Sequence, residues 1–259
     1  MQEKVVVVTG ASSGIGAVLA EQLGARGARV VLVARREREL REVAAKIGDR
    51  ATVSVADVTR RDDVERVAHD VIAALGQLDV WVNNAGRGIS RMVSELSDAD
   101  FDEMMLVNVK SALYGMQAVL PHFRARGRGH IINVSSMLGR VPMAPFRSAY
   151  SAAKHALNAL TANLRMELHA FPEIHVSAVH PGVVATDFGL RALHGGLDSR
   201  SLPGAQTPQD VAASIVETIE LPRADVYTRP GAKQLVLSYY GAEDMNDAEQ
   251  KPPFLLFGR

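Results

Sequence analysis

Short apolar runs alternate with amphipathic stretches along most of the chain. The first run, Val5 to Val8, is wholly β-branched, which is typical of a strand buried on both faces of a parallel sheet. Further strands are predicted at 29–34, 51–56, 78–82, 129–136, 174–179 and about 226–228. Because helical periodicity separates these runs, we expect a single α/β domain over residues 1–259. Its core would be a doubly wound parallel sheet of about seven strands with helices on both faces.

Periodicity lapses between about 187 and 208, where glycines and prolines accumulate. A long irregular segment in a compact domain is usually functional or disordered, and its position here predicts a lid over a substrate site. A helix is predicted to follow, with Thr207 as its N-cap and Pro208 in its first position. The tail at about 230–259 mixes apolar runs with charges and prolines, so it could pack on a partner subunit or hang loosely.

A glycine-rich turn follows the first strand directly. It reads Thr9-Gly10-Ala11-Ser12-Ser13-Gly14-Ile15-Gly16 and leads into a helical pattern. Glycines let a pyrophosphate approach the backbone, and the helix N-terminus offers free N–H groups and the positive end of its dipole. The alternative is an ordinary turn between strand and helix. The turn predicts a dinucleotide site whose candidate residues are Gly10, Ser12, Ser13, Gly14, Ile15 and Gly16.

The end of the second strand bears on which dinucleotide is bound. NAD-preferring folds place an acidic residue there to bond the ribose hydroxyls, whereas this chain has Ala34 followed by Arg35 and Arg36. A guanidinium can clamp a 2′-phosphate through paired hydrogen bonds. We therefore expect NADP(H) rather than NAD(H), with Arg35 the stronger candidate. Alternatively, both arginines are the solvated start of a helix at 36–47.

Tyr150 and Lys154 lie four residues apart in a predicted helix from about Ser148 to Ala170, so they share one face. A neighbouring ammonium favours the phenolate, and we expect the pKa of Tyr150 to fall from its usual ~10 toward neutral. Such a tyrosine can give or take a proton at working pH. Ser136, at the carboxyl end of the fifth strand, is the better placed of two serines to bond a substrate carbonyl oxygen.

These elements follow one another in the order of a known family. The glycine turn T-G-x-x-x-G-I-G, the sequence Asn83-Asn84-Ala85-Gly86, the Y-x-x-x-K pair and a P-G-x-x-x-T segment resemble the short-chain dehydrogenase/reductase family over about residues 4–190. The resemblance implies a Rossmann-like fold and hydride transfer between NADPH and a carbonyl carbon. Ser136 would then hold the carbonyl oxygen and Tyr150 would exchange a proton with it. Lys154 would lower the pKa of Tyr150 and bond the nicotinamide ribose.

The resemblance also implies roles along the rest of the cofactor. Asp57, after the third strand, would bond the adenine amino group and Val58 would pack on the ring, although Thr59 and Asp62 look equally suited to cap the next helix. The residues that would line the ribose are Asn84, Ala85 and Gly86. Those that would approach the nicotinamide and its phosphate are Pro181, Gly182, Val183 and Thr186.

Asn108 lies in a long predicted helix from about Asp98 to Phe123. In the resembled family an asparagine here holds a water near the catalytic lysine through a local distortion of the helix. From the residues alone it is a polar group in an apolar stretch, which needs hydrogen bonds if it is buried. The family is usually dimeric or tetrameric through this helix and the one at 148–170, so we expect a homodimer or homotetramer.

The amino-acid composition argues against several classes of binding partner and of chemistry. Lys+Arg and Asp+Glu both number 29, so no global charge attracts nucleic acid or an anionic membrane. No apolar run approaches the ~20 residues of a spanning helix, and the N-terminus runs straight into a strand, which predicts a cytoplasmic protein. The chain has no cysteine, which excludes disulfides and thiolate catalysis. Neither histidines nor carboxylates show metal-ligand spacing, so no metal site is expected.

Other functions compete with catalysis on a small carbonyl or alcohol. A protein that senses NADP(H) without turnover commonly loses a catalytic group, whereas Asn108, Ser136, Tyr150 and Lys154 are all present. A sugar-nucleotide epimerase or dehydratase usually has a longer C-terminal domain than this chain allows. A ketone, an aldehyde, a steroid-like alcohol and a 3-oxoacyl thioester all remain possible substrates. The interval from Ser136 to Tyr150 is one residue longer than expected, which bears on loop shape and substrate fit.

Overall fold

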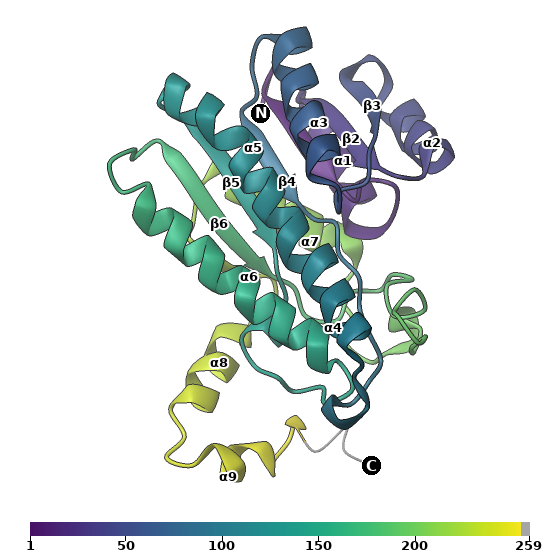
Figure 1. Ribbon diagram of the computed structural model, residues 1–259, viewed down its shortest axis with the longest axis vertical. Coiled ribbons are helices and arrows are strands. Elements are labelled where there is room, and N and C mark those ends of the chain that lie inside the picture. The colour runs from purple at the N-terminus through teal and green to yellow at the C-terminus, as the bar shows by residue number, and fades with distance from the viewer. Residues whose placement is uncertain (255–259) are drawn as a thin grey trace.

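A computed structural model describes residues 1–254 and shows one parallel sheet with the strand order β3-β2-β1-β4-β5-β6-β7 (Figure 1). The order reverses direction at β1, as in doubly wound folds. The predicted fold class is therefore confirmed. The strands are β1 Val5–Thr9, β2 Arg29–Ala34, β3 Ala51–Val55, β4 Val80–Asn83, β5 Gly129–Val134, β6 Ile174–His180 and β7 Asp225–Tyr227.

Helices connect the strands and cover both faces of the sheet. The helices are α1 Gly14–Ala25, α2 Glu37–Ile47, α3 Arg61–Leu75, α4 Asp98–Met105, α5 Ser111–Arg126, α6 Ser148–Glu167, α7 Pro208–Glu220, α8 Ala232–Tyr240 and α9 Met245–Glu249. Short 3₁₀ turns lie at Gly48–Arg50, Val93–Glu95, Met137–Gly139 and Ser199–Ser201. In Figure 1, α5 and α6 cross the near face of the sheet, while α8 and α9 lie beyond the ends of the strands.

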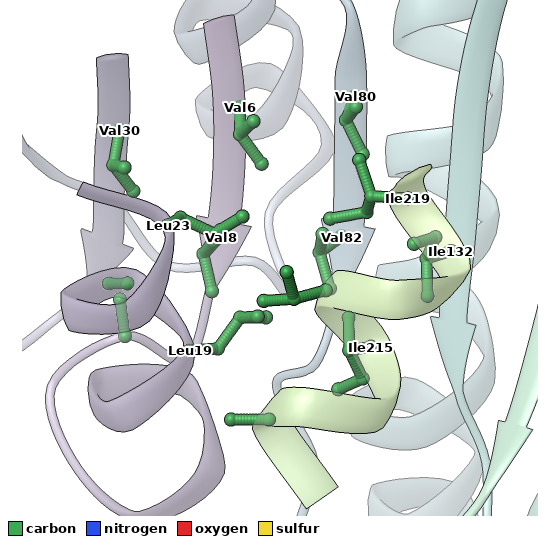
Figure 2. Packing of buried hydrophobic residues seen from close by; sticks show 14 of the residues in the cluster. Val6, Val8, Leu19, Leu23, Val30, Val80, Val82, Ile132, Ile215 and Ile219 are labelled. Atoms are coloured by element: carbon green, nitrogen blue, oxygen red, sulfur yellow. The ribbon is translucent and has the colours of Figure 1, made fainter. Parts of the chain in front are cut away.

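The alternation of side chains along β1 divides the core in two. Val6 and Val8 point to one face, where they join residues of α1, α2 and α7 in one apolar cluster. Figure 2 shows Ile215 and Ile219 of α7 directed at the strands on this face. Val5 and Val7 point to the other face, against α3, α5 and α6. This two-sided burial is why the strand is continuously apolar rather than alternating.

Helix ends agree with the sequence in some places and differ in others. Thr207 caps α7 by accepting from the Asp210 N–H at 3.1 Å, with Pro208 in the first turn, as predicted. The alternative role of Thr59 or Asp62 as cap of α3 is wrong, because the N-cap is Arg60 and no side chain caps the helix there. The predicted helix 98–123 runs to residue 126 and is interrupted by a π-helical turn, Leu106–Lys110.

The described part of the tail packs on its own chain. Val236 and Tyr239 of α8 join Met137 and Val141, from the loop after β5, in a small apolar cluster. The Tyr240 hydroxyl also donates to the Arg140 carbonyl at 2.8 Å. Of the two possibilities left open for the tail, a loosely hanging tail is wrong up to residue 254, because α8 packs on the apolar residues of the loop after β5. The remaining apolar tail positions, 255–257, lie outside the described residues.

No helix within residues 1–254 combines the length and apolar character that crossing a membrane would need.

The two-sided core gives a test of packing. Ile219 on α7 is 2% exposed, so Ile219→Ala is expected to lower the free energy of unfolding by about 3 kcal/mol through lost burial and a residual cavity. Leu221, just beyond the same helix, is 63% exposed, and Leu221→Ala is expected to change the free energy of unfolding by less than about 0.5 kcal/mol. Urea unfolding would measure both. Equal losses would contradict the assigned packing of α7.

Candidate active site

The glycine-rich turn lies against the turn that follows β4. A Cβ on Gly10, whose φ is +67°, would come within 2.9 Å of the Ala85 Cα atom. A Cβ on Gly16 would come within 2.6 Å of the Asn84 amide nitrogen. Side chains at these two positions would push the turns apart. The glycines therefore allow two strand ends to meet beside the N-terminus of α1, where Ser12, Ser13, Gly14 and Ile15 lie.

Thr9 ties the same two turns together. Its hydroxyl donates to the Val82 carbonyl at 3.1 Å and accepts from the backbone N–H groups of Asn84 and Ala85 at 3.0 and 3.1 Å. The Asn84 side chain donates back to the Thr9 carbonyl at 2.9 Å. The structure thus brings the predicted N-N-A-G element, with Gly86 at its exposed end, directly beside the glycine turn.

Arg36, rather than Arg35, reaches the glycine-rich turn. Its guanidinium donates to the hydroxyls of Ser12 at 2.8 Å and Ser13 at 2.9 Å, and it pairs with Glu39 at 3.2 Å. The Arg35 side chain is 76% exposed and lies 3.8 Å from an Asp57 carboxylate oxygen. These contacts favour Arg36 over Arg35, contrary to the preference drawn from the sequence.

Asp57 and Val58 follow β3 as predicted, at the same edge. An Asp57 carboxylate oxygen accepts from the Thr59 N–H at 3.0 Å and from its hydroxyl at 2.7 Å, which fixes the turn. Val58 is partly buried against the apolar cluster on the α3 side. The adenine contacts expected of both residues stay a prediction.

The P-G-x-x-x-T segment passes over the start of α1. A Cβ on Gly14 would lie 3.3 Å from the Thr186 methyl group, so this threonine faces the glycine turn. At the other end of the segment, the Pro181 carbonyl accepts from the Met137 N–H at 2.8 Å. Gly182 and Val183 lie between these two points. The segment thereby links the glycine turn to the loop that follows Ser136.

Ser136 and Tyr150 are buried side by side. Each is 7% exposed, and the Ser136 hydroxyl accepts from the Leu138 N–H at 3.1 Å at the start of a 3₁₀ turn. The Tyr150 ring packs edge-on against Phe188, with the centroids 5.6 Å apart. Phe188 belongs to the segment 187–208 that the sequence singled out as a lid, so that segment reaches the tyrosine.

Lys154 and Asn108 converge beneath Gly86. The Lys154 amine donates to the Val134 carbonyl at 2.9 Å and is 3% exposed. A Cβ on Gly86 would lie 2.9 Å from Asn108 Oδ1 and 3.6 Å from Lys154 Nζ. The Asn108 amide group donates to the carbonyls of Arg87 and Met104 at 2.9 and 3.1 Å, so this buried asparagine is satisfied. The π-helical turn carrying Asn108 is a helix distortion of the kind the resemblance implied.

The protonation equilibria differ from the simple expectation for a tyrosine beside a lysine. Burial raises the pKa of Tyr150 to about 12, while the Ser136 hydroxyl and the Arg147 charge oppose that rise. Burial also lowers the pKa of Lys154 to about 8. The expected fall of the Tyr150 pKa toward neutral is therefore wrong for the protein alone, because desolvation outweighs the Ser136 hydrogen bond and the Arg147 charge.

Arg147 is a site residue that the sequence reasoning missed. It lies one turn before Tyr150, and its charge is one of the two influences that oppose the rise in the Tyr150 pKa. Its position three residues before the tyrosine could have singled it out. An arginine at the start of a helix reads as a solvated group, however, and gives no sign that the loop at 88–91 will cover it.

The family model for short-chain dehydrogenases matches residues 4–193. The chain belongs to the short-chain dehydrogenase family. An uncharacterized oxidoreductase of Staphylococcus epidermidis is 39% identical over 197 residues, which cover 74% of this chain and 85% of the relative. One of Staphylococcus saprophyticus is 36% identical over 232 residues, covering 86% and 93%. The protein is thus an oxidoreductase of this family.

Solved structures of the family superpose closely. A short-chain dehydrogenase from Streptomyces avermitilis has a TM-score of 0.83 at 32% identity, covering 92% of each chain. A family member from Burkholderia phymatum, in complex with NAD, has a TM-score of 0.85 at 26% identity, covering 97% of this chain and 96% of that one. An alcohol dehydrogenase from Thermococcus sibiricus, complexed with 5-hydroxy-NADP, has a TM-score of 0.77 at 27% identity, covering 87% and 96%.

The buried amine gives a stability prediction with a defined sign. The pKa of Lys154 falls from 10.5 to about 8, so between these values the unfolded chain binds more protons and stability rises with pH. Below the lower of these two pKa values the folded protein keeps the buried Lys154 charge, and the loss of stability caused by burying it is then largest. Lys154→Met is therefore expected to raise the free energy of unfolding by about 2 kcal/mol at pH 7, after allowing for the lost hydrogen bond.

That gain should shrink as the pH rises through the same window, which urea unfolding at several pH values would measure. The control is Lys46→Met, because Lys46 is exposed and paired with Glu21 at 2.8 Å. This control should change stability by less than about 0.5 kcal/mol. A gain from Lys154→Met that did not vary with pH would contradict the assigned desolvation.

Proposed function

We propose that the protein interconverts a carbonyl compound and an alcohol by hydride transfer, with NADP(H) as cofactor. One observation carries the proposal. Ser136, Tyr150 and Lys154 are buried together at the carboxyl ends of the strands, next to a glycine-lined cradle beside a helix N-terminus. Proton-transfer groups and a phosphate cradle at one sheet edge are the parts that such a reaction needs.

The residues present suit a dinucleotide. Gly10 and Gly16 leave the backbone bare where a pyrophosphate would approach, and the start of α1 supplies N–H groups for it. The Arg36 guanidinium beside the hydroxyls of Ser12 and Ser13 offers cationic and neutral donors for a 2′-phosphate. No carboxylate occupies the end of β2, where NAD-preferring proteins keep one. The cofactor, when bound, supplies or accepts the hydride.

The chain's own groups handle the proton and the oxygen. Ser136 holds the substrate oxygen, and Tyr150 gives it a proton in reduction or removes one in oxidation. The Lys154 amine lies 5.6 Å from the centre of the Tyr150 ring, and its charge favours the phenolate left after proton transfer. Asn108 fixes the backbone at Arg87 and thereby shapes the floor of the site beneath Gly86.

The segment 187–208 acts as the lid in this proposal. Phe188 meets the Tyr150 ring, and Leu193 exchanges backbone hydrogen bonds with Gly88 and Ser90. The described contacts thus anchor the lid on the loop after β4. The assembly through α5 and α6 as a homodimer or homotetramer, a cytoplasmic location and a single domain over the whole chain remain predictions.

The alternative cofactor, the sensor function and the thioester substrate can each be distinguished from the proposal. The relatives' structures include complexes with NAD and with NADP, so NAD(H) remains the alternative cofactor. A sensor without turnover would keep cofactor binding but gain nothing from the buried Ser136 and Tyr150. A 3-oxoacyl thioester would need a basic docking surface for its carrier.

Tyr150→Phe tests the reaction. We expect turnover of carbonyl substrates to fall by about a thousandfold, because the proton donor is lost while the packing ring remains. NADPH binding, followed by nicotinamide fluorescence, should be retained. Tyr239→Phe is the matched control, since within residues 1–254 that hydroxyl bonds the tail residue Glu249, at 2.8 Å, and no group of the site. Unchanged turnover in Tyr150→Phe would refute the proposed mechanism, and binding without turnover in the unaltered protein would support the sensor.

Arg36→Leu tests the cofactor preference. We expect NADPH affinity to fall by about tenfold to a hundredfold, as for other charge-assisted hydrogen bonds, and NADH affinity to stay the same. Arg38→Leu is the control, because Arg38 is 83% exposed and its ion-pair partner is Glu42. The same titrations on Arg35→Leu rank the two arginines. Equal loss of both cofactors would show that Arg36 only holds the glycine turn in shape.

A further inference from the structure

Arg147 is a half-buried cation next to the catalytic tyrosine. A Cβ on Gly88 would lie 2.8 Å from Arg147 Nη1 and 2.9 Å from the Phe188 ring. Phe188 itself packs against Tyr150, so the Phe188 ring is close to both the guanidinium and the phenol. Gly88 leaves room for this arrangement because it has no side chain. The Arg147 charge is also close enough to Tyr150 to oppose the rise in the pKa of the tyrosine.

The charge of Arg147 has no acidic partner within residues 1–254. Its one hydrogen-bond acceptor there is the carbonyl of Ile89, 3.0 Å from Nη1. Burial lowers its pKa, and the Tyr150 phenol is the one group that acts in the opposite direction. A buried guanidinium usually gains a carboxylate or several acceptors in exchange for lost hydration. Among residues 1–254, Arg147 has the Ile89 carbonyl and the Phe146 ring, whose centre is 5.3 Å from its Cζ atom, but no carboxylate.

The second terminal nitrogen of Arg147 faces the lid. A Cβ on Gly196 would lie 3.2 Å from Arg147 Nη2, and no residue within 1–254 accepts a hydrogen bond from this nitrogen. The backbone on either side is fixed, because the Arg91 N–H donates to the Phe146 carbonyl at 2.8 Å and the Ser148 hydroxyl donates to the Arg91 carbonyl at 2.7 Å. A guanidinium held in place, with donors that have no acceptor among the described residues, is preorganised for a planar anion.

We propose that Arg147 binds a carboxylate of the substrate, and that the protein therefore acts on an oxo acid or the corresponding hydroxy acid. The inference rests on the proposed function, because it places the substrate between Tyr150 and Arg147. Phe188 packs on the apolar part between the two polar ends. The carboxylate supplies the acidic partner that Arg147 lacks among residues 1–254.

The test compares acids with their neutral esters. The probes are pyruvate, acetoacetate and levulinate, whose ketone and carboxylate are progressively farther apart, together with their methyl esters. With the unaltered protein and NADPH, we expect at least one acid to exceed its ester in kcat/KM by about tenfold to a hundredfold, the range of a hydrogen-bonded charge pair. No preference for any acid would overturn the proposal.

Variants at Arg147 distinguish binding of the substrate carboxylate from a purely structural role of this residue. Arg147→Met should abolish the preference by raising KM for the acid far more than for the ester, whereas any effect through Tyr150 would lower kcat for acid and ester alike. Arg147→Lys should retain part of the preference, since it keeps the charge without the fork. Arg191→Met is the matched control, because Arg191 lies exposed on the lid and pairs with Asp187. Equal losses for acid and ester in Arg147→Met would mean that the residue serves Tyr150 or the Ile89 loop, and would overturn the proposal.

Calorimetry distinguishes failure of this inference from failure of the proposed function. Titration of the NADP-loaded protein with the same acids and esters needs no turnover. Absence of turnover with all of these compounds and with neutral ketones would count against the proposed function. The carboxylate site would then stand or fall on whether an acid binds more tightly than its ester, and whether Arg147→Lys weakens that difference.

Discussion

Burial of the Lys154 amine is the constraint around which the site is built. An ammonium with 3% exposure must find acceptors or lose its proton, and in this protein it has the Val134 carbonyl and a pKa lowered to about 8. The carbonyl is available because it belongs to the last residue of β5, where the ladder ends. Gly86 lets Asn108 and Lys154 approach from below, and the π-helical turn directs Asn108 there. The end of β5, Gly86 and the π-helical turn thus all help to accommodate the buried Lys154 amine.

The regular framework could be predicted because local and global patterns agree. β1 is continuously apolar because both of its faces are covered, and α7 begins at Thr207-Pro208 because those residues suit a helix N-terminus. The glycine turn and the N-N-A-G element were predicted separately, and their contact follows from the position of β1 beside β4. Residues at the carboxyl ends of parallel strands meet at one edge, so most of the candidate site could be assembled from the sequence.

The features that could not be predicted depend on three-dimensional distances, which the spacing of residues along the sequence does not give. Arg35 and Arg36 differ by one position, and the direction of each side chain after β2 decides which one reaches the serines. The pKa of Tyr150 depends on the competition between neighbouring charges and burial. The sequence reveals which residues are charged, but not how deeply the tyrosine is buried. The tail was ambiguous because its partner, the loop after Ser136, is itself irregular. Arg147 was missed because its environment comes from the loop at 88–91 and the lid, both remote in sequence.

Two cations with different surroundings flank one phenol, and this arrangement has an electrostatic consequence. Burial lowers the pKa of both Lys154 and Arg147, and no carboxylate of residues 1–254 influences the pKa of either. Positive charge held in a poorly hydrated site favours negative charge that appears nearby, whether on the Tyr150 oxygen or on a substrate oxygen held by Ser136. Such charge forms only as the proton moves. The burial that raises the Tyr150 pKa in the resting protein therefore also strengthens the attraction on which the reaction would depend.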